Sequence, residues 1–475
     1  MSDTALATAH PRRIDQIVVG RVITMNPDRE VIENGAVAIA GGDILAVGPR
    51  PAVLRAYEPA RVLGGPRAIV MPGMIDTHTH CAQAFVRSLT AGELPMIPRI
   101  YVPAMRALSP EQGQAAVRLM LAQLLRAGVT TVCEGTAIVG HEDVTLAAFE
   151  EVGLRCCFAR GAPDQDFSHA SLYTQATTRS SIRAREGEAE ADLARTEALL
   201  SRYPSHGPGR IRAAINTSAV LNFSEAYLRQ AARLARRHGA TMHVHVARDR
   251  KEVEFALAVW GRRPIERLAD LDVLGGHLVA AHAVLATGAE IDLLGTSGSA
   301  LAHAPVECVH NLNAVPDLQR FRRAGVRVGL GCDGQGNDIL ATMRVALLIH
   351  GALWGIPRYE PDYLNADDVL AMATIDAARI LRWDDRIGSL EPGKAADLVM
   401  LDGAAPHLMA TQDLVTDLVR YGSRGEITHV MVDGRVLFDG ESYATLDLPR
   451  IEADARACAA LVRDAVADRR YRPLR

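Results

Sequence analysis

Short apolar runs alternate with amphipathic stretches through the middle of the chain. A short apolar run bounded by turn signals is typical of a strand buried in a parallel sheet. The eight runs are 69–78, 130–137, 155–162, 210–218, 241–247, 277–284, 299–306 and 327–334. Helical spacing of apolar residues separates them, over segments such as 110–127, 142–153, 224–239 and 312–325. The alternation predicts β-α-β units in an α/β fold, and eight of them predict a closed (β/α)8 barrel.

Both ends of the chain have a different pattern. Residues 14–49 alternate short β-type runs with turns, and the same pattern occurs at 388–402 and 428–440. The last segment also contains an Asp-Gly pair, which is typical of a β-hairpin turn. Two such ends can form one small sheet or sandwich. The predicted units are a composite β-sandwich domain (1–67 and 386–445), a TIM-type barrel (68–385), and a C-terminal helix packing on the body (446–475).

Composition narrows the classes of function. The chain has 475 residues, of which 48% are hydrophobic and 23% charged, which is ordinary for a globular protein. The net charge is −4, so the protein has no overall positive charge to attract nucleic acid or an anionic membrane. Its aromatic content of 4% leaves few side chains on which nucleic-acid bases could stack. No run approaches the roughly 18 to 20 apolar residues of a membrane span. We therefore expect a small-molecule substrate, with no nucleic-acid partner and no membrane.

The number and spacing of the cysteines indicate the cellular compartment. The chain has seven cysteines, an odd number without zinc-finger spacing, and its first residues lack the apolar segment of a signal peptide. Such cysteines are typical of reduced core thiols. We therefore expect a cytoplasmic protein.

Histidines and one aspartate stand at the carboxyl ends of the predicted strands, which is where barrels build their active sites. They are His78 and His80 after the first run, His245 in the fifth, His282 in the sixth and Asp333 in the eighth. His78 and His80 are two positions apart on a strand, so both point into the barrel mouth. Imidazoles with one carboxylate suit zinc, iron, cobalt or nickel better than calcium or magnesium.

Other residues near these strand ends are candidates for supporting or substrate-binding roles. His243 repeats the spacing before His245, but it would lie a layer deeper, where a hydrogen-bonded core position is the simpler reading. Asp76 is a candidate hydrogen-bond acceptor behind the metal ligands. The predicted substrate-binding residues are Gln83, Phe85, Arg87, Asn216, His303 and Asn337. The apolar segment 96–105 fits either an aromatic or lipophilic substrate or a packing or dimer contact.

The order of these motifs resembles the amidohydrolase superfamily, from about residue 14 to 440. The matching segments are PGMIDTHTH, the single His245, LVAAHAV, GLGCDG, GSLEPGKAADLVMLD and VMVDGR. The resemblance implies a distorted (β/α)8 barrel with a β-sandwich from both chain ends, and a homo-oligomer of two or more subunits.

The resemblance also bears on the number of metal ions. Binuclear members bridge two metals with a lysine at the end of the fourth strand, whereas Lys251 and Lys394, the two lysines of this chain, lie outside the barrel strands. Similarity to the mononuclear branch implies one divalent metal per chain, zinc by default, with iron, cobalt or nickel also compatible. It implies that the ligands are His78, His80, His245 and Asp333, and that His282 orients the attacking water.

One position departs from the pattern of that branch. Its deaminases and triazine hydrolases usually have a glutamate three residues after the fifth-strand histidine, where this chain has Arg248. The glutamate protonates a ring nitrogen, which an arginine with a pKa above ~12 cannot do. We therefore expect attack on the carbonyl of a urea, amide or (thio)carbamate, as in the similar phenylurea and molinate hydrolases. Arg248 would stabilise the oxyanion, and Asp333 or His282 would pass the proton.

The alternative hypothesis is an aminohydrolase, deaminase or dechlorinase of a nitrogen heteroaromatic such as a purine, pyrimidine or s-triazine. Asp249, Glu252 or Glu307 would then replace the missing acid. The purely structural interpretation of Arg248 is a salt bridge to Glu252, four residues on. A non-catalytic homologue is disfavoured because the chain keeps the whole predicted ligand set.

Overall fold

The computed structural model describes seven stretches of the chain: 11–90, 96–135, 138–173, 179–312, 314–334, 336–361 and 363–467. Residues 1–10 of the predicted small domain and 468–475 of the predicted terminal helix lie outside these stretches.

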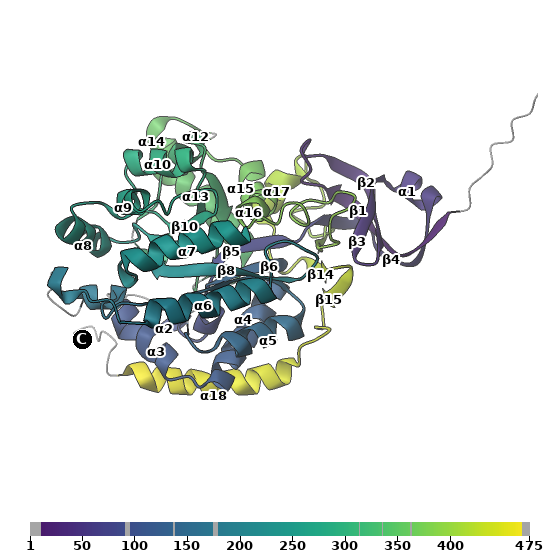
Figure 1. Cartoon of the computed structure of the whole chain (residues 1–475). Helices are drawn as coiled ribbons and strands as arrows, with labels where there is room; N and C mark the ends of the chain where they lie inside the picture. Colours follow the sequence, from purple (N-terminus) through teal and green to yellow (C-terminus); the bar gives the residue numbers. More distant parts are fainter. Residues whose placement is uncertain are drawn as a thin grey trace, which may run out of the picture.

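Within the described residues, eight parallel strands follow one another around a nearly closed barrel (Figure 1). They are β5 (Met74–Thr79), β6 (Val129–Gly135), β7 (Arg155–Arg160), β8 (Ile211–Ala219), β9 (Met242–Val246), β10 (Leu278–His282), β11 (Ala300–His303) and β12 (Arg327–Leu330). Thr77 Oγ1 donates to the carbonyl of Leu330 at 2.8 Å, which joins the last strand to the first. The eight predicted runs therefore correspond to the eight strands, and the α/β barrel fold is confirmed.

Helices cover the outside of the barrel. The principal ones are α4 (Pro110–Arg126), α5 (Glu142–Val152), α6 (Glu188–Arg202), α7 (Glu225–His238), α8 (Arg250–Trp260), α9 (Pro264–Asp270), α10 (Gly288–Ser297), α12 (Leu318–Arg323), α13 (Ile339–His350), α15 (Ala366–Met372) and α16 (Ile375–Ile380). The predicted helix over 312–325 is shorter than expected, because Pro316 disfavours a helical residue before it and Asp317 caps α12 by accepting from the Arg320 N–H at 3.2 Å.

The small domain is one seven-stranded sheet among the described residues, in the order β15-β14-β13-β4-β1-β2-β3. Its strands are β1 (Arg12–Ile23), β2 (Val31–Ala40), β3 (Asp43–Pro49), β4 (Tyr57–Pro72), β13 (Leu398–Asp402), β14 (Ile427–Val432) and β15 (Arg435–Phe438). Ile39 shares one apolar core with Leu398 and Met431 from the other end of the chain. The sheet therefore folds over itself, and β4 continues past residue 67 into the start of the barrel.

Shorter helices complete the described fold. They are α1 (Arg50–Ala56), α2 (Arg87–Thr90), α3 (Val102–Arg106), α11 (Pro305–Glu307), α14 (Ile356–Arg358), α17 (Leu414–Tyr421) and α18 (Leu448–Val466). The terminal helix α18 lies along the outside of the barrel against α3 and α4 (Figure 1).

A continuous helical run, Ile339–Arg358, is long and apolar enough by length and composition to cross a membrane. The sequence pattern did not single it out, because Arg344 and His350 interrupt its apolar residues. Its apolar window is 39% buried in the fold, and one such helix is weak evidence because core helices meet the same criteria.

Candidate active site

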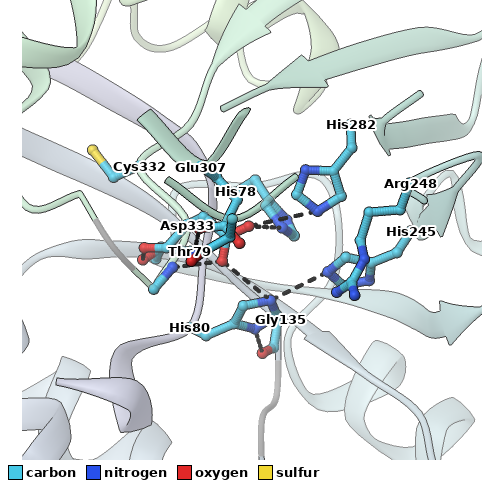
Figure 2. Close-up of polar contacts among 12 residues, drawn as sticks. His78, Thr79, His80, Gly135, His245, Arg248, His282, Glu307, Cys332 and Asp333 are labelled. Atoms are coloured by element: carbon cyan, nitrogen blue, oxygen red, sulfur yellow. Dashed lines mark hydrogen bonds and ion pairs between the residues drawn. The ribbon is translucent and has the colours of Figure 1, made fainter. Parts of the chain in front are cut away.

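Four imidazoles and one carboxylate converge at the carboxyl end of the barrel (Figure 2). Asp333 Oδ2 lies 3.5 Å from His78 Nε2 and 3.5 Å from His282 Nε2. His80 Nε2 lies 3.2 Å from His245 Nε2 and 3.9 Å from Asp333 Oδ1. The structure thus brings together the four predicted metal ligands and the predicted water-orienting histidine.

The backbone around these residues is held in unusual conformations. His282 has a φ of 71° and Asp333 a φ of 54°, in the left-handed region that non-glycine residues seldom adopt. Position 331 requires glycine because the backbone there passes close to His78: a Cβ on residue 331 would lie 2.8 Å from the Cβ of His78. Asp76 accepts from the N–H groups of His78 at 3.1 Å and Cys332 at 3.0 Å. Asp76 is therefore a hydrogen-bond acceptor behind the predicted ligands, as expected, and it acts through the backbone of two strand ends.

The residues present fit a divalent metal ion. The Gly135 carbonyl can only accept, so His80 Nδ1 donates to it at 2.6 Å and the lone pair of Nε2 faces His245. His78 Nε2 is buried without a hydrogen-bond partner among the described residues. Burial lowers the pKa of His80, His245 and His282, which favours the neutral form that binds metals. Separations of 3.2 to 3.9 Å are close to the edges of a tetrahedron with bonds of about 2.0–2.2 Å.

A cavity opens directly above this cluster. Its apolar wall comes from Ile97, Tyr101 and Val102, within the segment 96–105 that was predicted to contact substrate or to pack. Its polar wall includes Gln83, Asn216, Ser218 and Asn222. Gln83 and Asn216 are predicted substrate-binding residues. Ser218 and Asn222 were not predicted, although their positions at and after the end of β8 are the signal that could have identified them.

The other four predicted substrate-binding residues lie elsewhere. Phe85 belongs to the apolar core. Arg87 Nη2 donates to Gln123 Oε1 of α4 at 2.7 Å, and Asn337 donates to the same oxygen. His303 is fully buried and its Nε2 lies 2.9 Å from Nε2 of His350. Contacts with α4 thus turn Arg87 and Asn337 away from the cavity, and a contact with α13 does the same for His303.

His243 lies below the mouth of the barrel, as expected. Its Nε2 lies 2.9 Å from Thr241 Oγ1, and the thiols of Cys133 and Cys157 lie 3.6 and 3.9 Å from the same nitrogen. Another buried acid, Glu134 at the end of β6, accepts from the Cys81 N–H at 2.8 Å, and burial raises its pKa to about 7. Glu134 was not predicted, although its strand-end position is again the signal.

Arg248 lines the cavity beside the predicted metal ligands (Figure 2). Its Nη2 lies 3.4 Å from Asp249 Oδ2, while its backbone N–H donates to Glu252 Oε2 at 2.8 Å. The salt bridge to Glu252, considered as the purely structural alternative, is thus replaced by a backbone contact and a pairing with Asp249.

Two carboxyl groups share this cavity with the arginine. They belong to Glu252 and Glu307, and both are almost completely buried. Burial raises the pKa of each to about 8. The cavity therefore holds protonatable carboxyl groups in spite of the arginine at position 248.

A family model described as the amidohydrolase family matches residues 69–437, so the chain belongs to that family. A 5-methylthioadenosine/S-adenosylhomocysteine deaminase of Nitratidesulfovibrio vulgaris is 32% identical over 439 residues, which cover 92% of this chain and 94% of the relative. A relative with the same name from Pelotomaculum thermopropionicum is 31% identical over 443 residues, which cover 92% and 95%.

Solved structures show the same fold. An adenosine deaminase from Xanthomonas campestris with bound zinc has a TM-score of 0.85 and 26% identity, covering 96% of this chain and 100% of that one. A triazine hydrolase variant has a TM-score of 0.80 and 22% identity, covering 94% and 100%.

These relatives correct the prediction on the reaction. Proteins named as deaminases contradict hydrolysis of a urea, amide or carbamate and favour the alternative of heteroaromatic deamination. No relative described above supports the predicted likeness to phenylurea and molinate hydrolases. The reaction was mispredicted because the missing glutamate at position 248 was given more weight than the possible replacement acids, two of which, Glu252 and Glu307, line the cavity.

Proposed function

We propose that this protein is a metal-dependent aminohydrolase that removes the amino group from the adenine ring of a nucleoside or of a nucleoside thioether. The observation that carries the proposal is the convergence of four imidazoles and Asp333 on the floor of a cavity that also holds buried carboxyl groups. The relatives named as deaminases of adenine-containing compounds support this choice among the heteroaromatic substrates.

We propose zinc as the metal, because the adenosine deaminase of similar structure is described with zinc bound. His78, His80, His245 and Asp333 would hold it, and a bound zinc would lower the pKa of a water molecule to about 7. His282 Nε2, 3.5 Å from Asp333 Oδ2, is positioned to orient the attacking water by a hydrogen bond. The Asp333–His282 pair is positioned to accept a proton from that water.

The walls of the cavity suit a planar ring whose edge can form hydrogen bonds with side-chain amides. Ile97, Tyr101 and Val102 offer an apolar surface to the faces of a ring, whereas Asn216 and Gln83 offer donors and acceptors to its edge. A largely apolar pocket with few polar groups is the usual form of a small-molecule site.

A substrate panel with metal analysis on the same sample tests the proposal. The panel contains adenosine, 5-methylthioadenosine, S-adenosylhomocysteine, guanine, cytosine, a chlorotriazine and an N-phenylurea. We expect about one zinc per chain and ammonia release from the adenine compounds. Release of chloride from the triazine alone, or no release of ammonia from any adenine compound, would overturn the proposal.

A further inference from the structure

Hydrolytic deamination of an aromatic ring needs more than an activated water. The ring nitrogen next to the reacting carbon must gain a proton, and the amino group must leave as ammonia. Arg248 faces the cavity but keeps its proton, so the donor must be another group. Three carboxyl groups lie close enough in the fold to be compared, those of Asp249, Glu252 and Glu307.

The Asp249 side chain caps the N-terminus of α8. Its Oδ1 accepts from the Glu252 N–H at 3.0 Å, which caps the helix, and its Oδ2 accepts from the Tyr173 hydroxyl at 2.8 Å. Arg248 lies 3.4 Å from the same Oδ2. Asp249 is not among the described residues that line the cavity. Both of its oxygens are therefore engaged in holding the loop after β9.

Glu252 lines the cavity but is tied to the same turn. Its Oε2 accepts from the Arg248 N–H at 2.8 Å, and its Oε1 is buried without a partner among the described residues. The charged groups that influence it most are Asp249 and Arg248, its neighbours along the chain. Glu252 thus fixes the backbone that carries Arg248.

Glu307 occupies a different place. It ends the short helix α11, which follows β11 at the carboxyl end of the barrel, and it lines the cavity together with His282 and Asp333. Its Oε2 accepts from Asn311 Nδ2 at 2.7 Å, and it has no ion pair among the described residues. The charged groups that act on it are Asp333, from the floor of the cavity, and Arg248, from the wall. Figure 2 shows Glu307 on the side of the site occupied by His78 and Asp333.

We propose that Glu307 is the catalytic acid of this site, an inference that rests on the proposed deamination. Glu307 donates its carboxyl proton to the ring nitrogen, water oxygen bonds to the adjacent carbon, and the Asp333–His282 pair takes one water proton. That proton then passes to the amino group, the C–N bond breaks, and ammonia leaves with the bonding electron pair. The hydroxyl proton of the adduct returns to Glu307, which leaves a ring carbonyl and the starting enzyme.

The surroundings of Glu307 suit this cycle. Burial favours its protonated form before the reaction, whereas the nearby charge of Arg248 favours the carboxylate that remains after donation. Asn311 holds one oxygen and leaves the other available to the substrate. Arg248 would then be a positioning residue that supports a relocated acid.

Substitution of Glu307 by glutamine tests the role, because glutamine keeps the size of the side chain and can still accept from Asn311. We expect kcat for the adenine substrate to fall by about 10²–10⁴-fold, with KM changed less than about threefold and the metal content unchanged. Glu254→Gln, at an exposed position of α8 outside the cavity, is the control and should keep kcat within about threefold. Glu252→Gln tests the rival carboxyl group and should lower kcat less than Glu307→Gln does. Glu307→Asp, which retains a carboxyl group on a shorter side chain, should keep more activity than Glu307→Gln.

The outcomes separate the two proposals. A wild-type protein that deaminates adenine compounds, with Glu307→Gln equally active, would support the function and overturn the role of Glu307. A larger loss of kcat in Glu252→Gln than in Glu307→Gln would also overturn it. A metal-loaded wild type that releases no ammonia would overturn both proposals. Calorimetric binding of the product nucleoside by Glu307→Gln would show that the variant's cavity is intact.

Discussion

His282 and Asp333 stand in left-handed conformations that cost about 1–3 kcal/mol each in a non-glycine residue. Such conformations persist only when the surroundings determine them. Here the Asp333 N–H donates to the His78 carbonyl at 2.8 Å, and the N–H of Ala283, next to His282, donates to the Val246 carbonyl at 3.1 Å. Ala247 and Ala283, which follow the strands of His245 and His282, are also left-handed, with φ of 47° and 44°. At this scale the molecule holds four imidazoles and one carboxylate in a fixed arrangement before any substrate arrives.

Replacing His245 by alanine should remove a metal ligand. We expect metal retained after dialysis to fall well below one per chain and kcat to fall by at least about 100-fold. His243→Gln is the control, because His243 lies deeper and contacts Thr241 rather than the other imidazoles. Elemental analysis of both variants is the measurement, and equal loss of metal from the two would contradict the choice of His245.

Replacing Glu252 by glutamine should change how stability depends on pH. Burial raises the pKa of Glu252 from 4.5 to about 8, so the folded state favours its protonated form. That contribution is complete below pH 4.5 and is lost as the pH rises through about 8. Wild-type stability should therefore fall between pH 5 and 8, relative to Glu252→Gln, by on the order of 2 kcal/mol. Urea midpoints across this range are the measurement, and parallel curves would contradict the assignment.

The sequence could predict that the site's histidines and Asp333 cluster, because they stand at strand ends, where position fixes direction. Their division into metal ligands and a water-orienting His282 was implied by the family resemblance. Gln83 and Asn216 also reach the cavity, whereas Arg87 and His303 do not. Their directions depend on Gln123 and His350, partners distant in sequence that no local pattern reveals. Arg248 was read as a change of reaction, because the sequence does not show that Glu307 faces the same cavity.

Among the elements, the periodic patterns predicted every barrel strand, with ends that differ from the observed ones by up to five residues. Apolar spacing predicted neither the late start of α12 nor the extension of β4 to Pro72. The first depends on Pro316, and the second on a strand that runs from the small sheet to the start of the barrel. α17 shows how local and tertiary signals agree: it buries Leu414 and Leu418, and Asp413 caps its start by accepting from the Thr416 N–H at 3.0 Å.

Removing the cap of α17 should weaken the fold modestly. Asp413→Ala should lower the free energy of unfolding by about 1 kcal/mol, because the Thr416 N–H loses its acceptor. Asp413→Ser keeps a capping oxygen and should stay within about 0.5 kcal/mol of the wild type. Denaturant unfolding of the three proteins is the measurement. An alanine variant as stable as the serine variant would show that the cap contributes nothing.

For the molecule as a whole, the barrel and the small sheet are joined by a buried ion pair. Arg155 of β7 donates to both oxygens of Asp397 at 2.7 and 3.0 Å, and it also pairs with Asp433 in the turn before β15. The Arg155 side chain is 1% exposed. Its charge is therefore compensated only when the two units are in contact, so the contact links their stabilities.

Replacing Arg155 by methionine should leave two carboxylates without their partner at this contact. We expect a loss of about 3–5 kcal/mol in stability, because breaking one side of a buried pair strands the other charge. Arg13→Ala is the control: Arg13 pairs with Glu58 at the surface, where the arginine side chain is 89% exposed, and its loss should cost under about 1 kcal/mol. Thermal unfolding compares the variants, and similar melting temperatures would contradict the coupling.

The most direct test of the account is the rate of ammonia release from adenosine, 5-methylthioadenosine and S-adenosylhomocysteine by the metal-loaded wild-type protein. We expect saturable release from at least one of them, with the loss of one amino group per nucleoside and no amine release from an N-phenylurea. Absence of ammonia release from all three, in protein that holds about one metal per chain, would contradict it.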